Sequence, residues 1–384
     1  MNPIDKQALS DFPTEITDSL KTPCYLISRD VIKRNCEILN SVQERTGAKI
    51  LLALKAFAMP AVFPLIAEYL HGVCASGPIE AQMGREEFGR EVHTYSPAFS
   101  DEQFKRTVKY SDHIIFNSIS QFSLFREQVP ATKHIGLRVN PGHAEVETEL
   151  YNPCMPGSRF GVNPADLDGV DISRVDGLHF HAMCEQGADV LVRVLKSFEK
   201  LYSDFIPQMK WINLGGGHHI TKSDYDIELL VKTINDFKAK YDVDVYLEPG
   251  EAIVLDAGVF VTSVLDTIKN GVDIAILDSS AEAHLPDVLA MPYRPHLVGE
   301  GGDTQYKLGG ISCLAGDFLG TYSFDKPLRR GDRLVFTDMA LYSFVKNTTF
   351  NGVELPDLIT FSLESGTIDM VKEFGYADYK GRLA

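Results

Sequence analysis

The chain has 384 residues, of which 44% are hydrophobic and 23% charged, a composition typical of globular proteins with more than one domain. Its formal net charge of −16 argues against nucleic acids and anionic membranes as partners and would attract a polycation, although acidity that only maintains solubility gives the same charge. No apolar run is long enough to span a bilayer, and the polar, acidic N-terminus is not a signal peptide.

The six cysteines contain no CxxC pair. This usage is typical of reduced thiols and argues against a disulfide scaffold, so we expect a cytoplasmic protein. The cysteines are Cys24, Cys36, Cys74, Cys154, Cys184 and Cys313.

Eight short apolar runs, most of them followed by segments of helical periodicity, predict parallel strands that are buried on both faces. The predicted strands are 50–54, 72–75, 92–95, 113–116, 134–139, 177–181, 211–214 and 243–247. The predicted helices are 30–45, 78–88, 101–110, 120–128, 190–205 and 225–241. About eight such units in roughly 200–250 residues match the size of a (β/α)8 barrel, and a doubly wound open sheet is the main alternative.

Beyond about residue 250 the pattern changes to short strand-like runs such as "GVFVTSVLDTI" and "YSFVKNTTF", with Gly, Asp and Asn between them. This pattern indicates an all-β module. The run "CYLISRD" at 24–30 predicts a further strand that can pair with it. We therefore expect an α/β protein with a barrel at 26–251 and a β domain at 252–384, on which residues 1–25 pack.

Catalytic residues of barrel enzymes follow the C-terminal ends of the strands, so a closed barrel would bring the residues at these positions to one mouth. His179 and His181 lie on one face of their strand because side chains alternate with a period of two. The residues that follow or end predicted strands are Lys55, Ser76, Asn140, His179, His181, Gly215, Gly216, Gly217 and Glu248.

The chemistry of these residues fits one cofactor. Lys55, in "KILLALKAFAMP", is either a surface lysine with its stem on apolar neighbours or a desolvated amine for Schiff-base chemistry. Consecutive glycines let backbone N–H groups cradle a phosphate, a carboxylate such as Glu248 can keep a ring nitrogen protonated, and a histidine can stack on the ring. Together they predict pyridoxal 5′-phosphate (PLP).

Each feature also has a simpler interpretation. A glycine run is often only a flexible turn, and Glu–Pro–Gly is a common turn sequence. His179, His181 and Glu248 could instead form the zinc site of a metal-dependent barrel hydrolase. The combination favours PLP, and we assign no metal ligand from the sequence.

The chain resembles the PLP-dependent decarboxylases of the alanine racemase-like fold, the group of the diaminopimelate and eukaryotic-type ornithine decarboxylases. Within this group it is most similar to the carboxynorspermidine (carboxyspermidine) decarboxylase subfamily. The resemblance runs from "TPCYLISRD" to "TFNG" and includes "HFHAMCEQ", "KWINLGGGHHIT", "YLEPGEA", "LPDVLAMPYRP" and "GGISCLAGDFLG". It implies a PLP-binding (β/α)8 barrel, a C-terminal all-β domain and a homodimer with active sites shared between subunits.

The resemblance also implies individual roles. Lys55 would bind PLP covalently, His181 would stack on its ring and Glu248 would pair with its pyridine nitrogen. Cys313 would be the general acid donated by the other subunit. The remaining residues that we assign to the cofactor are Ser76, Gly215, Gly216, Gly217 and Tyr342.

A substrate of this subfamily is a polyamine with one terminal carboxylate, decarboxylated to norspermidine or spermidine in polyamine biosynthesis. Its ammonium groups need carboxylates. Many relatives read EPGR where this chain reads EPGE, which suits Glu251 to a substrate amine. Arg294 is either a clamp for a carboxylate or phosphate or a structural residue beside Pro295. The candidate carboxylates are Glu251, Asp287, Glu282, Asp303 and Asp317.

Three alternatives stay open at this point. The nearest is another amino-acid decarboxylase, acting on diaminopimelate, arginine or ornithine. A second is the metal-dependent hydrolase described above. A third is a PLP-binding relative without catalytic activity, against which the presence of both Lys55 and Cys313 argues.

Overall fold

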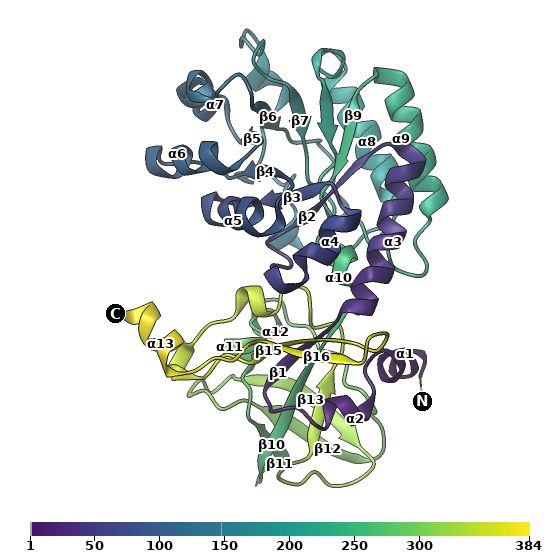
Figure 1. The fold of residues 1–384 in the computed structure, drawn as a ribbon, viewed down its shortest axis with the longest axis vertical. Helices are drawn as coiled ribbons and strands as arrows, with labels where there is room; N and C mark the ends of the chain where they lie inside the picture. The colour runs from purple at the N-terminus through teal and green to yellow at the C-terminus, as the bar shows by residue number, and fades with distance from the viewer. Residues whose placement is uncertain (1, 147) are drawn as a thin grey trace. The chain divides into compact units, whose positions relative to one another are not determined.

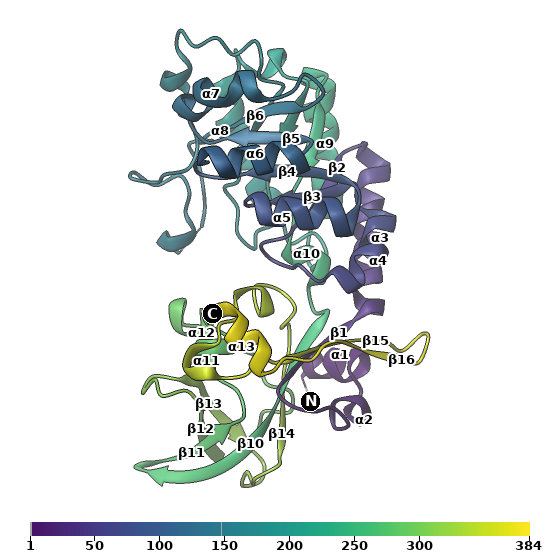
Figure 2. The same cartoon turned by 60° about the vertical axis from the view of Figure 1, so that its left-hand side comes forward.

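The computed structural model describes residues 2–146 and 148–384, which form two compact units (Figures 1 and 2). The first unit joins the N-terminal segment, up to Ile32, to Val254–Ala384. The second unit is Lys33–Ile253. Residues 26–32, which we predicted within the barrel range, belong to the first unit because the strand at Cys24–Ser28 pairs with its sheet.

The second unit is a closed barrel of eight parallel strands. Each strand pairs with the next, and β9 pairs with β2, which completes the ring and excludes the open-sheet alternative. The predicted strands coincide with the observed ones to within two residues at either end. The strands are β2 (Lys49–Ala53), β3 (Gly72–Ala75), β4 (Glu91–Tyr95), β5 (His113–Phe116), β6 (His134–Arg138), β7 (Gly177–His179), β8 (Trp211–Asn213) and β9 (Asp244–Leu247).

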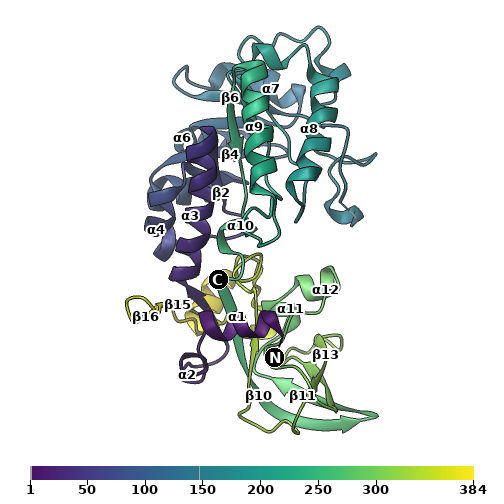
Figure 3. The same ribbon diagram turned by 90° about the vertical axis from the view of Figure 1, so that its right-hand side faces the viewer.

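Helices cover the outside of the barrel, and Figure 3 shows α9 beside α8 and α3. Ser100 and Gln103 form a capping box that begins α6, and an apolar stripe on each long helix faces the strands. Of this set, only α4 was not predicted. The helices are α3 (Arg29–Thr46), α4 (Phe63–Tyr69), α5 (Pro78–Met83), α6 (Asp101–Tyr110), α7 (Ile119–Phe125), α8 (Ala188–Tyr202) and α9 (Ile227–Tyr241).

The interior of the barrel is filled by side chains around Trp211, which packs with Leu51, Ile115 and Tyr246. The indole lies against two glycines of neighbouring strands, and a Cβ at Gly177 would stand 2.1 Å from it. Such a distance is far below van der Waals contact, so the strand can carry only glycine there without displacing the ring. The barrel is therefore a packed core, and ligands are confined to its ends.

The first unit is built on a mixed sheet in the order β13-β12-β11-β10-β1-β15-β16, with β14 paired to β10. The N-terminal strand β1 lies between β10 and β15, which confirms the expected pairing with the C-terminal module. The strands are β1 (Cys24–Ser28), β10 (Gly258–Asn270), β11 (Val272–Leu277), β12 (Thr304–Gly309), β13 (Phe318–Phe324), β14 (Arg333–Phe336), β15 (Asp357–Ser362) and β16 (Thr367–Lys372).

Short helices accompany this sheet. Phe12, after α1, packs into a cluster with Leu26, Val259 and Phe361. The C-terminal helix α13 was not predicted. The helices are α1 (Pro3–Asp11), α2 (Thr14–Thr17), α10 (Glu251–Val254, where the chain passes from one unit to the other), α11 (Ala281–His284), α12 (Asp287–Ala290) and α13 (Tyr376–Leu383).

Over the described residues, every helix is too short or too polar to cross a lipid bilayer.

Candidate active site

The predicted residues of the barrel meet at the carboxyl ends of its strands. Lys55 follows β2, Ser76 follows β3, and His181 lies two residues beyond β7. The positive charge of Lys55 affects His181 and also the Cys74 thiol, so these side chains are electrostatic neighbours. The sequence thus located one end of the barrel correctly as a meeting point of reactive groups.

The glycine triplet after β8 is packed too tightly for any side chain. A Cβ at Gly215 would lie 2.2 Å from the Phe180 carbonyl oxygen, and one at Gly216 would lie 2.2 Å from the Glu248 carbonyl oxygen. Gly215 and Gly217 also have φ values of +73° and +85°, which disfavour other residues. The triplet therefore threads between the ends of β7 and β9.

Two N–H groups of the triplet are already used within the protein. Gly215 donates to Oδ1 of Asn213 at 2.9 Å, and Gly216 donates to Nδ1 of His181 at 3.0 Å. The second bond fixes the orientation of the imidazole and leaves Nε2 as its protonated nitrogen. Of the expected phosphate cradle, the N–H of Gly217 is therefore the group best placed to serve a ligand.

Glu248 is held in place by two neighbouring strands. Its Oε1 accepts a hydrogen bond from Nδ2 of Asn213 at 2.7 Å, and its Oε2 lies 3.3 Å from Nε2 of His179. Burial alone would raise the pKa of this carboxyl, but His179 and Asn213 outweigh it and lower the pKa to about 2. Glu248 is therefore ionised at neutral pH.

Lys55 and His181 have opposite environments. The Lys55 side chain is exposed. Burial lowers the pKa of His181 well below its ordinary value, and the charges of Lys55 and Arg138 add to this effect. The imidazole is therefore neutral. His181 is turned toward the glycine loop and His179 toward Glu248, so the two histidines serve different partners instead of one shared metal position.

Carboxylates surround the same mouth. Glu251, at the start of α10, lies 3.2 Å from Nε2 of His219. Desolvation and the charge of Glu251 raise the pKa of Glu185. Glu80 accepts the backbone N–H of Ser76 at 2.6 Å, and desolvation raises its pKa as well. Burial disfavours the ionised form of both Glu80 and Glu185, and the charge of Glu251 adds to this effect at Glu185, so a cation placed between Glu185 and Glu251 would be stabilised.

Three residues of this site were not identified from the sequence. Asn213 links the glycine loop to Glu248, and Glu185 adds to the acidic rim. Arg138, at the end of β6, is buried and donates to the His181 carbonyl oxygen at 3.3 Å. The strand-end rule points to Arg138 and Asn213, whereas Glu185 lies four residues past His181 in a loop with φ of +53° and carries no such signal.

The other predicted residues belong to the first unit. Cys313 is exposed, and its N–H donates to Oδ1 of Asn351 at 2.7 Å, which joins the "ISC" loop to the "TTFNG" loop. Tyr342 is half-buried and has φ of +46°.

Asp317 is buried, and its carboxylate already accepts four hydrogen bonds. The donors are the Ser280 hydroxyl and the N–H groups of Ala281, Glu282 and Ser312. The Asp317 carboxylate thus joins the segment 280–282 to the loop at Ser312. It has little capacity left for a substrate amine, so the structure does not favour the substrate-binding role expected of Asp317. Glu282 is half-buried, and its own carboxylate is not among these acceptors.

Asp287 and Arg294 both have partners within the first unit. Asp287 pairs with Lys346. Arg294 pairs with Glu300, donates to the Thr321 carbonyl oxygen at 3.0 Å and stacks on the Tyr322 ring at 3.8 Å. These contacts favour a structural role for Arg294 over a clamp for a substrate carboxylate or a phosphate.

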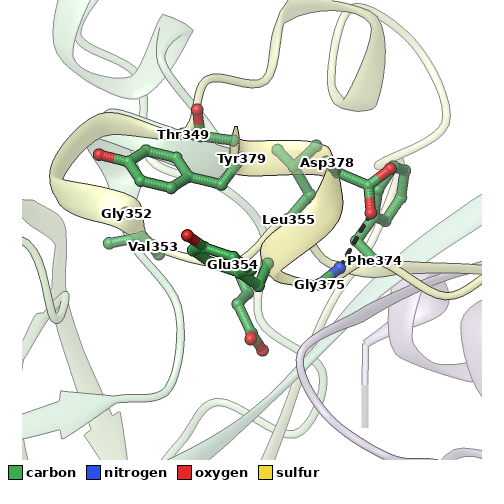
Figure 4. Close-up of a pocket in the computed structure, with 10 residues that line it drawn as sticks. Thr349, Gly352, Val353, Glu354, Leu355, Phe374, Gly375, Asp378 and Tyr379 are labelled. Carbon is green, nitrogen blue, oxygen red and sulfur yellow. Dashed lines mark hydrogen bonds between the residues drawn. The ribbon is translucent and has the colours of Figure 1, made fainter. Parts of the chain in front are cut away.

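The first unit also contains a small pocket of about 100 Å³ between the 349–355 loop and α13 (Figure 4). Figure 4 shows the Gly375 N–H bound to the Asp378 carboxylate at its rim, at 3.0 Å. The lining contains none of the predicted site residues. The pocket lies beside Asn351, the residue that holds the Cys313 loop.

The fold and the barrel mouth define a class of protein, and comparison with known families identifies it. The family model described as "Pyridoxal-dependent decarboxylase, C-terminal sheet domain" matches residues 24–340. The chain belongs to this family of pyridoxal-dependent decarboxylases. The family membership confirms the predicted cofactor class and reaction type, and it removes the hydrolase alternative.

Individual relatives narrow the comparison. A carboxynorspermidine/carboxyspermidine decarboxylase of Campylobacter jejuni is 44% identical over 95% of this chain and 99% of its own length. A carboxyaminopropylagmatine decarboxylase of Synechocystis sp. is 42% identical over 95% of this chain and 96% of its own length. The crystal structure of Campylobacter jejuni carboxynorspermidine decarboxylase with norspermidine matches with a TM-score of 0.88 and 43% identity, covering 94% of this chain and all of that one.

The electrostatics of Glu248 make the stability of the protein depend on pH. Its pKa is lower in the folded chain, about 2, than in the unfolded chain, roughly 4.3. The resulting stabilisation is complete above the unfolded value and is lost as the pH falls toward 2. The Glu248→Gln variant should therefore lose less free energy of unfolding than the parent between about pH 5 and pH 2.

Urea unfolding at a series of pH values measures this difference. Glu102→Gln, at an exposed position on α6, is the control and should follow the parent chain. Parallel pH profiles for the parent and Glu248→Gln would contradict the assignment of a lowered pKa to Glu248.

Proposed function

We propose that this chain decarboxylates a carboxylated polyamine, carboxynorspermidine or carboxyspermidine, to the corresponding triamine, with PLP as cofactor. The proposal rests above all on one observation: an ionised, largely buried carboxylate and a neutral imidazole adjoin one glycine loop, at a barrel mouth that also carries an exposed lysine and further carboxylates.

The residues at the barrel mouth fit PLP. When bound, PLP supplies an electron sink for the bond between Cα and the departing carboxylate. Lys55 offers an exposed amine for covalent attachment, and Glu248 can hold a proton on the pyridine nitrogen because it stays ionised. His181, fixed by Gly216, presents a neutral ring, and the N–H of Gly217 and the hydroxyl of Ser76, whose own N–H already donates to Glu80, would serve the phosphate.

The acidic rim supports a polycationic substrate. A linear polyamine carries several ammonium groups, each of which needs a carboxylate when it leaves water. Glu251 and Glu185 supply two negative charges whose mutual repulsion an ammonium would relieve. Relatives that are 42–44% identical act, by their names, on carboxylated polyamines or on an agmatine derivative, whereas a diaminopimelate decarboxylase of Pseudomonas fluorescens is 25% identical.

We further propose that the active enzyme is a homodimer in which Cys313 serves the partner's barrel as general acid. Cys313 lies outside the barrel unit, on a surface where apolar side chains are exposed. Ile311, Leu314 and Phe350 are each about two-fifths exposed, and they flank the loops joined by Cys313 and Asn351. Exposed apolar groups gathered in one place favour burial against another chain.

A cytoplasmic location accords with a reactive, reduced thiol at Cys313 and with the absence of disulfides among the described cysteines. Recovery of the protein in an exported or membrane fraction of its source cells would contradict this part of the proposal.

The covalent role of Lys55 has a direct test. Lys55→Ala should lose decarboxylation entirely, and borohydride reduction should leave no pyridoxyl mass on the peptide containing position 55, whereas the parent retains it. Lys49→Ala, at the other end of β2, is the matched control and should keep both properties. Retained activity in Lys55→Ala would refute the role.

Substrate recognition by the rim is tested by Glu251→Gln. Loss of one charge-assisted bond to an ammonium should raise KM for carboxynorspermidine by about 10- to 100-fold. Glu199→Gln, on the outer helix α8, should leave KM unchanged. Faster turnover of carboxyaminopropylagmatine, diaminopimelate or arginine than of either carboxy-triamine would reject the proposed substrate.

Shared active sites are tested by mixing two inactive variants. Lys55→Ala and Cys313→Ala should each be inactive, yet exchange of subunits should restore roughly a quarter of the parent activity because each mixed dimer contains one intact site. Failure to recover activity from a mixture shown to exchange subunits would overturn the proposed donation of Cys313.

A further inference from the structure

A second group of ionisable side chains lies at the amino ends of the barrel strands, opposite the candidate active site. Glu91 begins β4, His93 is the third residue of the same strand, and His113 begins β5. His71 directly precedes β3. Because parallel strands begin at one end of the barrel and finish at the other, Glu91, His113 and His71 lie at the end opposite to Lys55 and Glu248, and His93 lies in the middle of its strand.

The carboxylate of Glu91 is surrounded by imidazole nitrogens. Its Oε1 lies 2.7 Å from Nε2 of His93 and 3.6 Å from Nε2 of His113, and its Oε2 lies 3.2 Å from Nε2 of His71. One ligand atom from each of Glu91, His93 and His113 lies within 4.8 Å of the other two. The rings of His93 and His113 stack at 3.8 Å, so both present the same nitrogen to the carboxylate.

Two of these imidazoles are buried and incompletely bonded. His93 is fully buried and His113 is 3% exposed, yet Nδ1 of each has no hydrogen-bond partner among the described residues. A buried polar atom without a partner costs free energy, so the fold keeps these histidines at a cost. The Nε2 atom of each ring is directed at Glu91, so the polar atoms of both histidines meet at its carboxylate.

We propose that Glu91, His93 and His113, with His71 as a fourth donor, bind one divalent transition-metal ion of the zinc class at the base of the barrel. Imidazole nitrogen and carboxylate oxygen are ligands that zinc prefers. The site is distinct from the PLP chemistry of the opposite end and would stabilise the barrel by joining β4, β5 and the segment before β3.

The spacing of the donors suits this ion. Tetrahedral zinc with bonds of about 2.0–2.1 Å places its ligand atoms roughly 3.3 Å apart. The separations of 2.7, 3.2 and 3.6 Å from the Glu91 oxygens lie around this value, so the donor atoms themselves need to move little. Because the rings of His93 and His113 are stacked in parallel, binding of one ion by both requires one ring to rotate about its χ angles.

The protonation states and the access route are also suitable. Burial lowers the pKa of His113, and hydrogen bonds from His71 and His93 lower the pKa of Glu91, so both ligands are in the deprotonated forms that bind metals. The side chains of His71 and Glu91 are 37% and 23% exposed, which gives an ion a path from solvent.

The test uses the full-length, PLP-loaded protein. The chain is stripped with EDTA, dialysed against zinc and analysed by plasma mass spectrometry and thermal unfolding. The parent should retain about one zinc per chain and unfold at a higher temperature with zinc than without it. Glu91→Gln and His71→Ala should each weaken zinc binding by at least tenfold and reduce the shift in unfolding temperature.

Two control variants show whether zinc binds at Glu91 or elsewhere on the chain. His134→Ala alters a neighbouring, partly exposed histidine that pairs with Asp176, and it should bind zinc like the parent. Cys313→Ala should also keep the zinc, because that thiol lies in the other unit. Cobalt loaded in place of zinc should give the visible bands of a four-coordinate ion, a measurement on the parent that does not depend on how the variants fold.

Absence of retained zinc in the parent would overturn the proposal and leave a cluster that only shares a proton between Glu91 and His93. Zinc binding that survives Glu91→Gln or disappears in Cys313→Ala would also overturn it.

Discussion

The close passage of the glycine triplet between two strand ends is the constraint on which the barrel mouth depends. Carbonyl oxygens of Phe180, Met183 and Glu248 stand within 2.2 Å of where side chains at positions 215–217 would begin. Only a backbone without Cβ atoms lets Gly216 reach His181. The glycine loop thereby holds the neutral His181 ring on one side and adjoins the largely buried Glu248 on the other.

The electrostatics of the mouth follow from this packing. Glu248 remains ionised in spite of burial because Asn213 and His179 are held against it by β8 and β7. His181 remains neutral because burial and nearby positive charges disfavour its protonation. His181 and Glu248, which adjoin the same loop in space, thus have pKa values shifted away from their ordinary range, which is a common arrangement in sites that control protons.

The two ends of the barrel use the same architecture for different purposes. Parallel strands collect their last residues at one rim and their first residues at the other. The first rim carries Lys55, Glu248 and the acidic residues suited to a polycation, whereas the second gathers Glu91 with several histidines. The tightly packed interior around Trp211 lies between the two, although the charge of His93 contributes to the lowered pKa of Glu248 across it.

The sequence by itself determined the strand positions and the residues at the strand ends, because apolar runs and strand-to-helix alternation are local patterns. It favoured a barrel, but only the pairing of β9 with β2 in the structure excluded an open sheet. It could not determine which groups pair: Asn213 and Glu248 are 35 residues apart, and Asp317 accepts bonds from residues 35 to 37 positions away. It also left Arg294 undecided and gave no sign of the cluster around Glu91. Side-chain partners depend on how distant strands and loops come together, so only the tertiary structure decided them.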